Sequence, residues 1–461
     1  MKGFFFETKH GNRYFYNDIT GEVTYVGDEN LKTHHTVDDM KRISLPKVHE
    51  QDIRRFLEIN GAHELYLIVT EDCNLRCRYC VYSGNYENMR THRPVYMDFE
   101  VAKKAVDKFF EFYEEVSRRN PRLRPAVGFY GGEPLLNFKL IREVIEYIRK
   151  NGWNCLFTIT TNGVLVDGEI ADFLARNEVA LAISLNGPRE EHDRLRVFPD
   201  SSGTYEIIVN NMRKLKGKYP KYFAQYCDVI VCYDYGSDLL EMARFFDDNS
   251  DMLDVIRVNL IFEGFTNWYK QYSEEQVKLF AERMKKCREM YYRYLKEGKK
   301  SNFLHQLIGL QNYLILSRSM NLPLSYTRPP FLPFTATCVP GTKIAVEPQG
   351  TLHCCEKMPY NFPIGDVDRW LDFEKIKNLI EAYNNFMLPE CCDCPISRLC
   401  AICYAMVAGP DGFKKDPKDI CEKLKTSYRI LLSEIWSLLE EGLDLFKLVG
   451  HESYKQCGVF V

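Results

Sequence analysis

The sequence lacks a charge excess of one sign, a long apolar run, an internal repeat and a low-complexity segment. Its 61 basic and 64 acidic side chains give a net charge of −3, which argues against a protein that mainly binds phosphate backbones. No apolar stretch approaches the roughly 20 residues of a membrane span, and the start MKGFFFETKHGN lacks the apolar core of a signal peptide. The sequence therefore predicts no nucleic-acid partner, no membrane partner and a cytoplasmic location.

The length of the chain predicts several structural units. Its 461 residues are about three times a typical domain of roughly 150 residues, so two to four units are expected. Hydrophobic residues make up 45% and charged residues 27% of the chain, which is ordinary usage for a globular protein. This composition excludes disorder as the main state.

Apolar strand-like runs alternate with helical periodicity through the middle of the chain. In the best helical case, Asp98 is a suitable N-cap and the apolar residues up to Tyr113 recur on one face. Such alternation favours parallel strands joined by right-handed crossovers. Six strands are too few for a closed eight-stranded barrel, so we expect an α/β fold built on a partial (β/α)6 TIM-like barrel. The expected strands are 65–70, 126–130, 155–160, 180–185, 229–233 and 255–262.

The two flanks of this core differ from it in pattern. Three short aromatic strands at 4–7, 13–16 and 22–26, separated by turn signals, predict a small N-terminal β-rich α+β cap. An amphipathic helix is expected at 429–449. The predicted units are 1–60 (cap), 61–273 (partial barrel), 274–330 (helical linker), 331–425 (Cys-rich) and 426–461 (C-terminal helix).

The 17 cysteines are numerous and unevenly placed. Cytoplasmic thiols are kept reduced rather than paired, so metal ligation is the leading explanation for the clustered ones. An isolated cysteine usually behaves as a small buried apolar residue, which is our expectation for the remainder. The first group is Cys73, Cys77 and Cys80; the second is Cys338, Cys354, Cys355, Cys391, Cys392, Cys394, Cys400, Cys403 and Cys421; the isolated ones are Cys155, Cys227, Cys232, Cys287 and Cys457.

The first group has the spacing C-x3-C-x2-C and directly follows a predicted strand. The carboxyl ends of barrel strands are where active-site loops lie. Three thiolates on one loop can hold three irons of a [4Fe–4S] cluster and leave one iron open. A zinc site is the alternative, but a closed zinc site needs four ligands and no fourth Cys or His lies beside this loop.

This spacing, the aromatic Tyr79 before its last cysteine, and FYGGEP one strand later resemble the radical SAM superfamily over residues 62–265. The resemblance implies that the open iron chelates S-adenosylmethionine (SAM), which is cleaved to a 5′-deoxyadenosyl radical with an electron from a flavodoxin- or ferredoxin-type donor. It implies these roles: Cys73, Cys77 and Cys80 hold the cluster, Tyr79 lies near the adenine, and Gly131, Gly132, Glu133 and Pro134 face the methionine amino group. Read alone, GGEP also suits an ordinary turn.

Further polar residues follow the third and fourth expected strands. Thr161 and Asn162, then Ser184 and Asn186, offer hydroxyl and amide groups for a ribose or a carboxylate. The family often has Asp where Asn186 stands. By resemblance of the segment HDRLRVF, Arg196 is a candidate for binding the methionine carboxylate, with a surface salt bridge as the alternative.

The second cysteine group resembles the SPASM extension of radical SAM enzymes, which carries two auxiliary [4Fe–4S] clusters. The family arrangement implies an inner group of three cysteines and an outer group of four. Successive side chains of an extended segment point to opposite sides, so we expect Cys354 and Cys392 to be spectators. Cys354 completing the inner group, or zinc at the C-x2-C pairs, are the alternatives. The inner group is Cys338, Cys355 and Cys403; the outer group is Cys391, Cys394, Cys400 and Cys421.

The resemblance also implies a class of reaction. SPASM-bearing members mostly modify peptides, and an inner iron left open matches those of the sactipeptide and ranthipeptide type. These join a cysteine sulfur to a peptide carbon in a ribosomally made, Cys-containing precursor. The N-terminal strands then bind a leader peptide by strand addition, or they merely cap the barrel. The alternatives are a sulfatase-activating Ser or Cys oxidation, carbon–carbon bond formation or epimerisation, and a non-catalytic Fe–S electron carrier.

Overall fold

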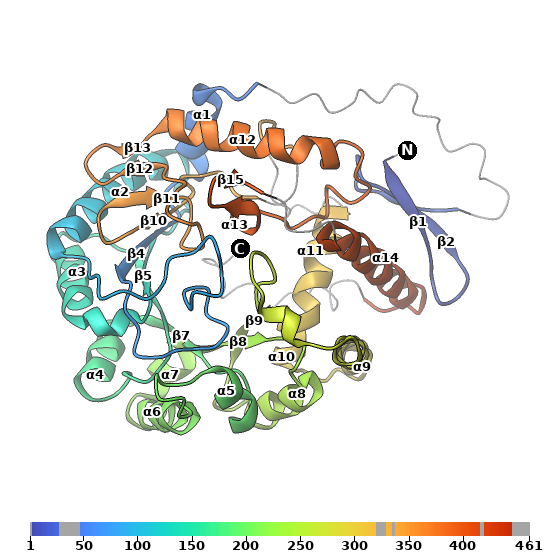
Figure 1. The fold of residues 1–461 in the computed structure, drawn as a ribbon, viewed down its shortest axis with the longest axis horizontal. Coiled ribbons are helices and arrows are strands. Elements are labelled where there is room, and N and C mark those ends of the chain that lie inside the picture. The colour runs from blue at the N-terminus through green and yellow to red at the C-terminus, as the bar shows by residue number, and fades with distance from the viewer. Residues whose placement is uncertain (1, 27–46, 320–328, 334–336, 415–418, 445–461) are drawn as a thin grey trace.

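The centre of the molecule is a strongly curved sheet with helices on its outer side, and a small second sheet lies beside the C-terminal helix (Figure 1). The structure is a computed structural model that describes residues 2–26, 47–319, 329–333, 337–414 and 419–444. Cys457 and the last part of the expected C-terminal helix fall outside these residues. Among the helices in these ranges, none combines the length and the apolar character needed to cross a bilayer.

Six parallel strands form the core of the main sheet and are adjacent in chain order. All six expected strands are present, with ends shifted by two residues at most, so the expected α/β fold is confirmed. Their apolar runs are explained by burial on both faces, which for β4 extends along the whole strand. The strands are β4 (Glu64–Thr70), β5 (Ala126–Gly131), β6 (Leu156–Thr161), β7 (Ala180–Ser184), β8 (Cys227–Tyr233) and β9 (Val255–Leu260).

Helices connect these strands and cover the outer face of the sheet (Figure 1). In α2, the side chain of Asp98 accepts a hydrogen bond from the backbone N–H of Val101 at 2.8 Å, which caps the helix. The face that includes Val106 and Phe109 is fully buried, as the apolar periodicity predicts. The helices are α1 (Glu50–Asn60), α2 (Phe99–Arg119), η1 (Pro134–Asn137), α3 (Phe138–Lys150), α4 (Gly168–Arg176), α5 (Arg189–Leu195), α6 (Tyr205–Lys218), α7 (Pro220–Tyr226) and α8 (Leu239–Asp248).

The Cys-rich region extends this sheet. Strand β10 (Lys343–Val346) pairs in parallel with β4, placing Ala345 opposite Tyr66. Strands β11 (Thr351–His353), β12 (Gly365–Asp366) and β13 (Trp370–Leu371) follow in antiparallel order, so the sheet has ten strands. Strands of two to four residues are too short to show a period-2 pattern, and the sequence did not predict this extension.

The N-terminal strands form their own sheet from β1 (Gly3–Glu7), β2 (Arg13–Asn17) and β3 (Val23–Tyr25). The expectation that this sheet caps the barrel is wrong, because it packs on α14 (Asp419–Glu440). The ring of Phe6 lies 5.9 Å from that of Trp436, and Ser437 Oγ accepts a hydrogen bond from the N–H of Lys9 at 3.0 Å. The apolar face of the small sheet is thereby buried against the apolar face of the helix.

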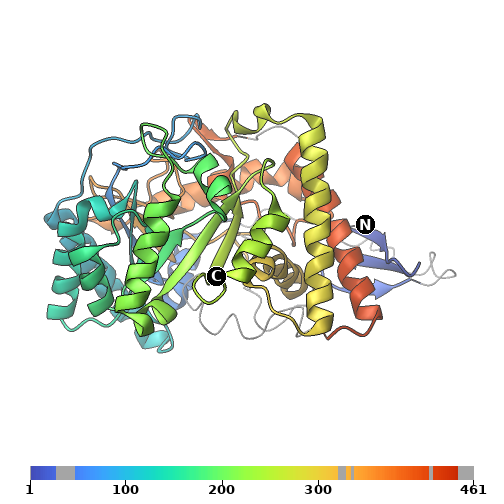
Figure 2. The same cartoon turned by 90° about the horizontal axis from the view of Figure 1, so that it is seen from below.

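The remaining helices pack beside α14. In Figure 2, α9 and α14 run side by side, and Arg288 joins them through an ion pair with Glu434 at 3.0 Å. Helix α14 begins at Asp419, earlier than the expected 429, so the expected boundary after 425 falls inside it. The other elements are α9 (Glu274–Glu297), α10 (Asn302–Leu304), η3 (His305–Gly309), α11 (Leu310–Ser319), α12 (Phe373–Cys391), α13 (Tyr404–Val407), β14 (Ala408–Gly409) and β15 (Gly412–Phe413).

Candidate active site and cluster ligands

The first cysteine loop leaves the carboxyl end of β4 and brings its three thiols together. Cys73 interacts electrostatically with Cys77 and Cys80. The backbone N–H of Leu75 donates to Cys73 Sγ, and that of Tyr82 donates to Cys80 Sγ, both at 3.4 Å. Burial raises the pKa of Cys73 and of Cys80 to about 12. Burial thus favours the neutral thiol, whereas a coordinated metal favours the thiolate, because coordination deprotonates a thiol.

A short backbone pairing holds this loop against the end of α5. Arg76 N–H donates to Val197 O at 2.8 Å, and Arg78 N–H donates to Leu195 O at 2.9 Å. Arg196 lies between these two acceptors, and its Nη1 donates to the hydroxyl of Tyr79 at 2.6 Å. Arg196 is 7% exposed, so the surface-salt-bridge alternative does not describe it.

Gly131 and Gly132 let the end of β5 approach the cysteine loop. A Cβ at Gly131 would lie 2.1 Å from Thr70 O, and a Cβ at Gly132 would lie 2.0 Å from Asp72 O. Both distances are far inside van der Waals contact, so only glycine fits. Pro134 follows as the first, buried residue of η1.

The carboxylate of Glu133 accepts hydrogen bonds from neighbouring residues of the protein. Its Oε1 accepts hydrogen bonds from the hydroxyl of Thr161 at 2.7 Å and from Leu135 N–H at 3.1 Å. Its Oε2 accepts from the N–H of Asn162 at 2.8 Å. The amide of Asn162 in turn donates to Asn74 Oδ1 at 2.8 Å. Glu133, Thr161 and Asn162 therefore tie β5 and β6 to the cysteine loop.

A second set of polar groups converges at the ends of β7 and β8. The Oδ1 of Asn186 accepts a hydrogen bond from Cys232 N–H at 3.1 Å. Asn186 is fully buried, and within the described residues neither its Nδ2 nor the Nε of Arg196 has a hydrogen-bond partner. Ser184, at the end of β7, is half-buried. Asn186 and Arg196 thus carry buried N–H donors without a partner, whereas the hydroxyl of Thr161 already donates to Glu133.

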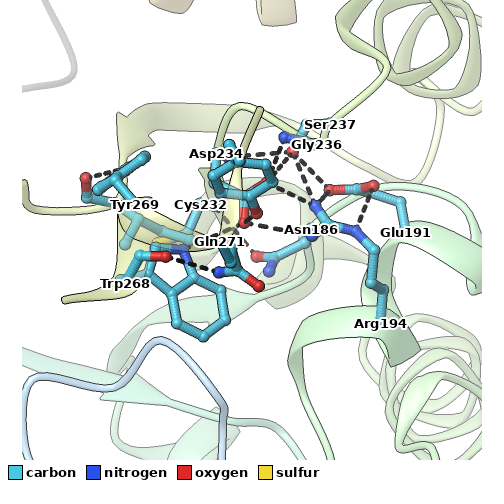
Figure 3. A network of polar contacts seen from close by, with 12 residues as sticks. Asn186, Glu191, Arg194, Cys232, Asp234, Gly236, Ser237, Trp268, Tyr269 and Gln271 are labelled. Carbon is cyan, nitrogen blue, oxygen red and sulfur yellow. Dashed lines mark hydrogen bonds and ion pairs between the residues drawn. The ribbon is translucent and has the colours of Figure 1, made fainter. Parts of the chain in front are cut away.

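An ion-pair network, which the sequence did not reveal, fixes this side of the site (Figure 3). Asp234 follows β8, has no exposed side-chain surface, and accepts from Arg194 Nη2 at 2.7 Å. Arg194 also pairs with Glu191 at 2.7 Å. Trp268 Nε1 donates to Asp234 at 3.3 Å, and the hydroxyl of Tyr272 donates to the same carboxylate. The sequence feature that could have pointed to Asp234 is its position directly after strand β8, where active-site residues of such folds lie.

The inner cysteine group lies near the cysteine loop, because the hydroxyl of Tyr82 donates to Glu356 O at 3.3 Å and Cys355 acts electrostatically on Tyr82. Cys338 interacts electrostatically with Cys355 and Cys403. Cys354 hydrogen-bonds to Cys355 instead of pointing away. The alternation argument is wrong here because the chain bends after β11, at Cys354, and an extended geometry no longer applies. The hydrogen bond with Cys355 and burial raise the pKa of Cys354.

A charged cluster borders the inner cysteine group. Lys343 Nζ lies 3.0 Å from Glu356 and 3.4 Å from Glu64, and it sits 4.0 Å over the ring of Tyr66. Burial alone would raise the pKa of Glu356, but the neighbouring Lys343 and Lys357 lower it to about 2. Lys343 also acts electrostatically on Cys338 and Cys355.

The outer cysteine group joins the end of α12 to the start of α14. Cys391 interacts electrostatically with the three other thiols of this group. Cys392 instead contacts Pro389 O at 3.9 Å and Asp393 at 3.6 Å. In the described ranges, no three His, Cys, Asp or Glu side chains converge where one metal ion could bind. The other members of the group are Cys394, Cys400 and Cys421.

Comparison with known proteins identifies the part of the chain that holds the first cysteine group. Residues 67–246 match the radical SAM superfamily. The matched segment, which is less than half of the chain, is thus similar to a radical SAM domain.

Sequence relatives of this chain include a sulfatase-maturating enzyme and a cyclopropyl synthase. The chain is 29% identical over 150 residues to a cysteine-type anaerobic sulfatase-maturating enzyme of Clostridium novyi, a match that covers 32% of this chain and 38% of that enzyme. It is 21% identical over 413 residues to the radical SAM cyclopropyl synthase TigE of Paramaledivibacter caminithermalis, which covers 86% of this chain and 80% of TigE. The chain thus spans less than half of the first relative's length.

The fold is also that of a solved structure. Native anSMEcpe with bound AdoMet and a Cp18Cys peptide superposes with a TM-score of 0.56 at 18% identity, covering 80% of this chain and 97% of that one. Radical SAM proteins use a [4Fe–4S] cluster and SAM, and the cysteines of the three groups in this chain are free thiols.

The residues present fit these cofactors. The three loop thiols suit three irons of one cluster. The unpartnered, buried donors of Arg196 and Asn186 suit a carboxylate or a hydroxyl group. Gly131 and Gly132 let backbone atoms approach a ligand closely.

Proposed function

We propose that this protein is a radical SAM peptide maturase that joins a cysteine sulfur to a carbon within a ribosomally made precursor peptide. When bound, the first cluster and SAM supply a 5′-deoxyadenosyl radical that removes a hydrogen atom from the peptide. The proposed cluster ligands are Cys73, Cys77 and Cys80. The residues proposed to surround SAM are Tyr79, Gly131, Gly132, Glu133, Pro134, Thr161, Asn162, Ser184, Asn186 and Arg196.

The observation that supports thioether formation is the composition of the inner cysteine group. Cys338, Cys355 and Cys403 lie together, with Lys343 of β10 beside them. Cys354 also interacts with all three, and we propose that it is not a ligand. A cluster held by three protein thiolates can take a substrate thiolate as its fourth. The ammonium of Lys343 favours an anionic sulfur in its neighbourhood.

The auxiliary region is part of the same proposal. We propose that β4 to β9 form the partial barrel and that residues 331–425 form the SPASM domain. Cys391, Cys394, Cys400 and Cys421 are the proposed ligands of the outer cluster. A flavodoxin- or ferredoxin-type protein is the proposed electron donor. The N-terminal sheet is the proposed leader-binding element, since Tyr25 on β3 is 57% exposed and within the described residues β3 pairs only with β2.

The hydrogen bond between Cys354 and Cys355 makes one experiment decisive for the open site. Cys355→Ala and Cys354→Ala are each reconstituted anaerobically with iron and sulfide, and iron per chain is measured. Loss of about four irons in Cys355→Ala alone supports three-thiolate ligation. Loss in both variants shows that Cys354 is a ligand and rejects an open inner site.

Carbon–carbon bond formation is the second candidate. It is favoured by the match to the cyclopropyl synthase TigE, which extends over most of both chains. Such a reaction needs no substrate thiolate, so it would leave the inner site without a role in binding sulfur. Sulfatase-type oxidation of a Ser or Cys side chain is a further alternative, supported by a match to a smaller part of that relative.

Intact-mass analysis separates these candidates. The reduced, reconstituted protein is incubated anaerobically with SAM and Cys-containing peptides encoded near its gene. Thioether closure removes two hydrogens and one alkylatable thiol. Carbon–carbon closure removes two hydrogens and keeps the thiol, whereas sulfatase-type oxidation gives an aldehyde that reacts with a hydrazide. A protein that never cleaves SAM would instead be an electron carrier.

A further inference from the structure

A cavity of about 320 Å³ lies between the cysteine loop and the Cys-rich region. It is formed by three segments that are far apart in the sequence and meet beside Tyr82. Tyr82 connects the cavity to the first cluster site, because its N–H donates to Cys80 Sγ at 3.4 Å. The lining residues come from 82–90, from 358–361 and from the turn at Pro410.

Side-chain amides hold the three segments together. Asn88 Nδ2 donates to Ala408 O. Asn361 Nδ2 donates to Gly409 O at 3.0 Å and to Pro410 O at 2.8 Å. These bonds fix the walls before any ligand arrives, so a ligand loses little binding energy to ordering them.

The wall of the cavity contains the cation Arg90 and the acidic residue Glu87. The guanidinium of Arg90 lies 3.7 Å from the ring centre of Tyr82 and 5.9 Å from that of Tyr360. Within the described residues Arg90 has no ion-pair partner, and its Nη2 is buried without a hydrogen bond. The carboxylate of Glu71 acts electrostatically on Arg90; its Oε2 pairs with Arg93 at 2.6 Å, and its Oε1 is buried without a hydrogen bond.

Two residues that line the cavity carry further unpartnered polar atoms. The hydroxyl of Tyr360 and Oδ1 of Asn88 are both buried and without a hydrogen-bond partner among the described residues. Two donors, Arg90 and Tyr360, suit the two oxygens of a carboxylate. The acceptor on Asn88 suits an amide N–H. Buried polar groups in proteins are rarely left unpaired, so a ligand that supplies these partners is the simplest explanation.

We propose that this cavity binds a carboxylate next to a peptide N–H, as found on an acidic residue or at the C-terminus of a peptide substrate. That the ligand is a peptide rests on the proposed function, whereas the carboxylate chemistry rests on Arg90 and Tyr360. Binding here places a substrate against Tyr82 and thus beside the loop of Cys80. The cavity thereby selects peptides with an acidic group at a fixed distance from the modified residue.

Small molecules can test whether the cavity binds a carboxylate, and no precursor peptide is needed. The reconstituted full-length protein is titrated with three compounds in ligand-observed NMR: N-acetylglutamate α-amide, N-acetylalanine and neutral N-acetylglutamine α-amide. We expect at least one of the two carboxylates to bind about tenfold more tightly than the glutamine compound. Preference for the first assigns the site to acidic side chains, and preference for the second assigns it to a C-terminus.

Variants locate this preference in the cavity. Arg90→Gln should abolish it, and Tyr360→Phe, which keeps the ring, should reduce it about threefold. Arg118→Gln, which removes an exposed arginine of α2 outside the lining, should retain it. Iron content and melting temperature show that each variant is folded, and Tyr360→Phe decides the matter if Arg90→Gln does not fold.

Equal binding of all three probes, or an undiminished preference in both Arg90→Gln and Tyr360→Phe, overturns the proposal. The result of this binding test does not depend on whether the protein modifies a peptide. A protein that modifies no peptide but prefers carboxylates at this cavity refutes the proposed function and leaves the site standing.

Discussion

The contact between Gly132 and the cysteine loop gives a prediction whose size follows from the coordinates. In Gly132→Ala the new Cβ would lie 2.0 Å from Asp72 O and 3.1 Å from Cys73 Cβ. Real Cβ contacts are almost never shorter than 3.0 Å, so the loop must move by about 1 Å. Overpacking of this kind costs about 1–3 kcal/mol of unfolding free energy. The displaced backbone carries Cys73, so the first cluster should be lost.

The assay is iron content with melting temperature. Three clusters hold about 12 irons per chain, and loss of one leaves about 8. SAM binding, measured by equilibrium dialysis, should fall at least tenfold because the cluster supplies part of its site. Gly217→Ala is the matched control: its Cβ meets nothing within 4 Å, and alanine is the better helix former.

The reasoning is refuted if Gly132→Ala keeps about 12 irons and the wild-type affinity for SAM. It is also refuted if Gly217→Ala is as damaging as Gly132→Ala, since general sensitivity to alanine would then explain both results.

Three further predictions address other parts of the site. His92 Nε2 lies 3.8 Å from Cys80 Sγ, and His92→Phe should lower the midpoint potential of the first cluster in an EPR-monitored titration, since hydrogen bonds to sulfur tune it. Cys391→Ala should lose about four irons on reconstitution, whereas Cys392→Ala should lose none. Asp234→Asn should lower the free energy of unfolding by about 2–3 kcal/mol at pH 7. Burial alone would raise the pKa of Asp234, but Arg194, Tyr272 and Gly236 bring it below its ordinary value. In denaturant titrations at several pH values its stabilisation should therefore be present above the unfolded pKa of about 4 and be lost as the pH falls through the folded pKa.

The parts of the fold that could be predicted are those with local signals. Strand β4 and helix α2 follow from runs of apolar residues and from the cap at Asp98. The C-x3-C-x2-C spacing placed three thiols on one loop because sequence neighbours are also spatial neighbours there. The pairing of β10 with β4 gave no signal, since four residues are too few to show alternation.

The polar site was only partly predictable, for a different reason. Arg194 and Asp234 are 40 positions apart, and each alone is typical of an exposed charge. The internal use of Glu133 by Thr161 and Asn162 also depends on two strands lying side by side. The placement of Cys354 beside Cys355 was not predictable, because alternation holds only while a strand stays extended and the chain bends there.

The parallel pairing of β10 with β4 has a consequence for protein engineering. The two strands share hydrogen bonds along Lys343–Val346, so the segment that leads into the inner cysteines is registered residue by residue against the segment that leads into Cys73. A chimera that exchanges the C-terminal half between relatives therefore also exchanges the edge of the catalytic sheet, and its junction must preserve this register. Deleting that half would uncover a strand whose side chains are buried throughout, and the remaining half should aggregate at that edge.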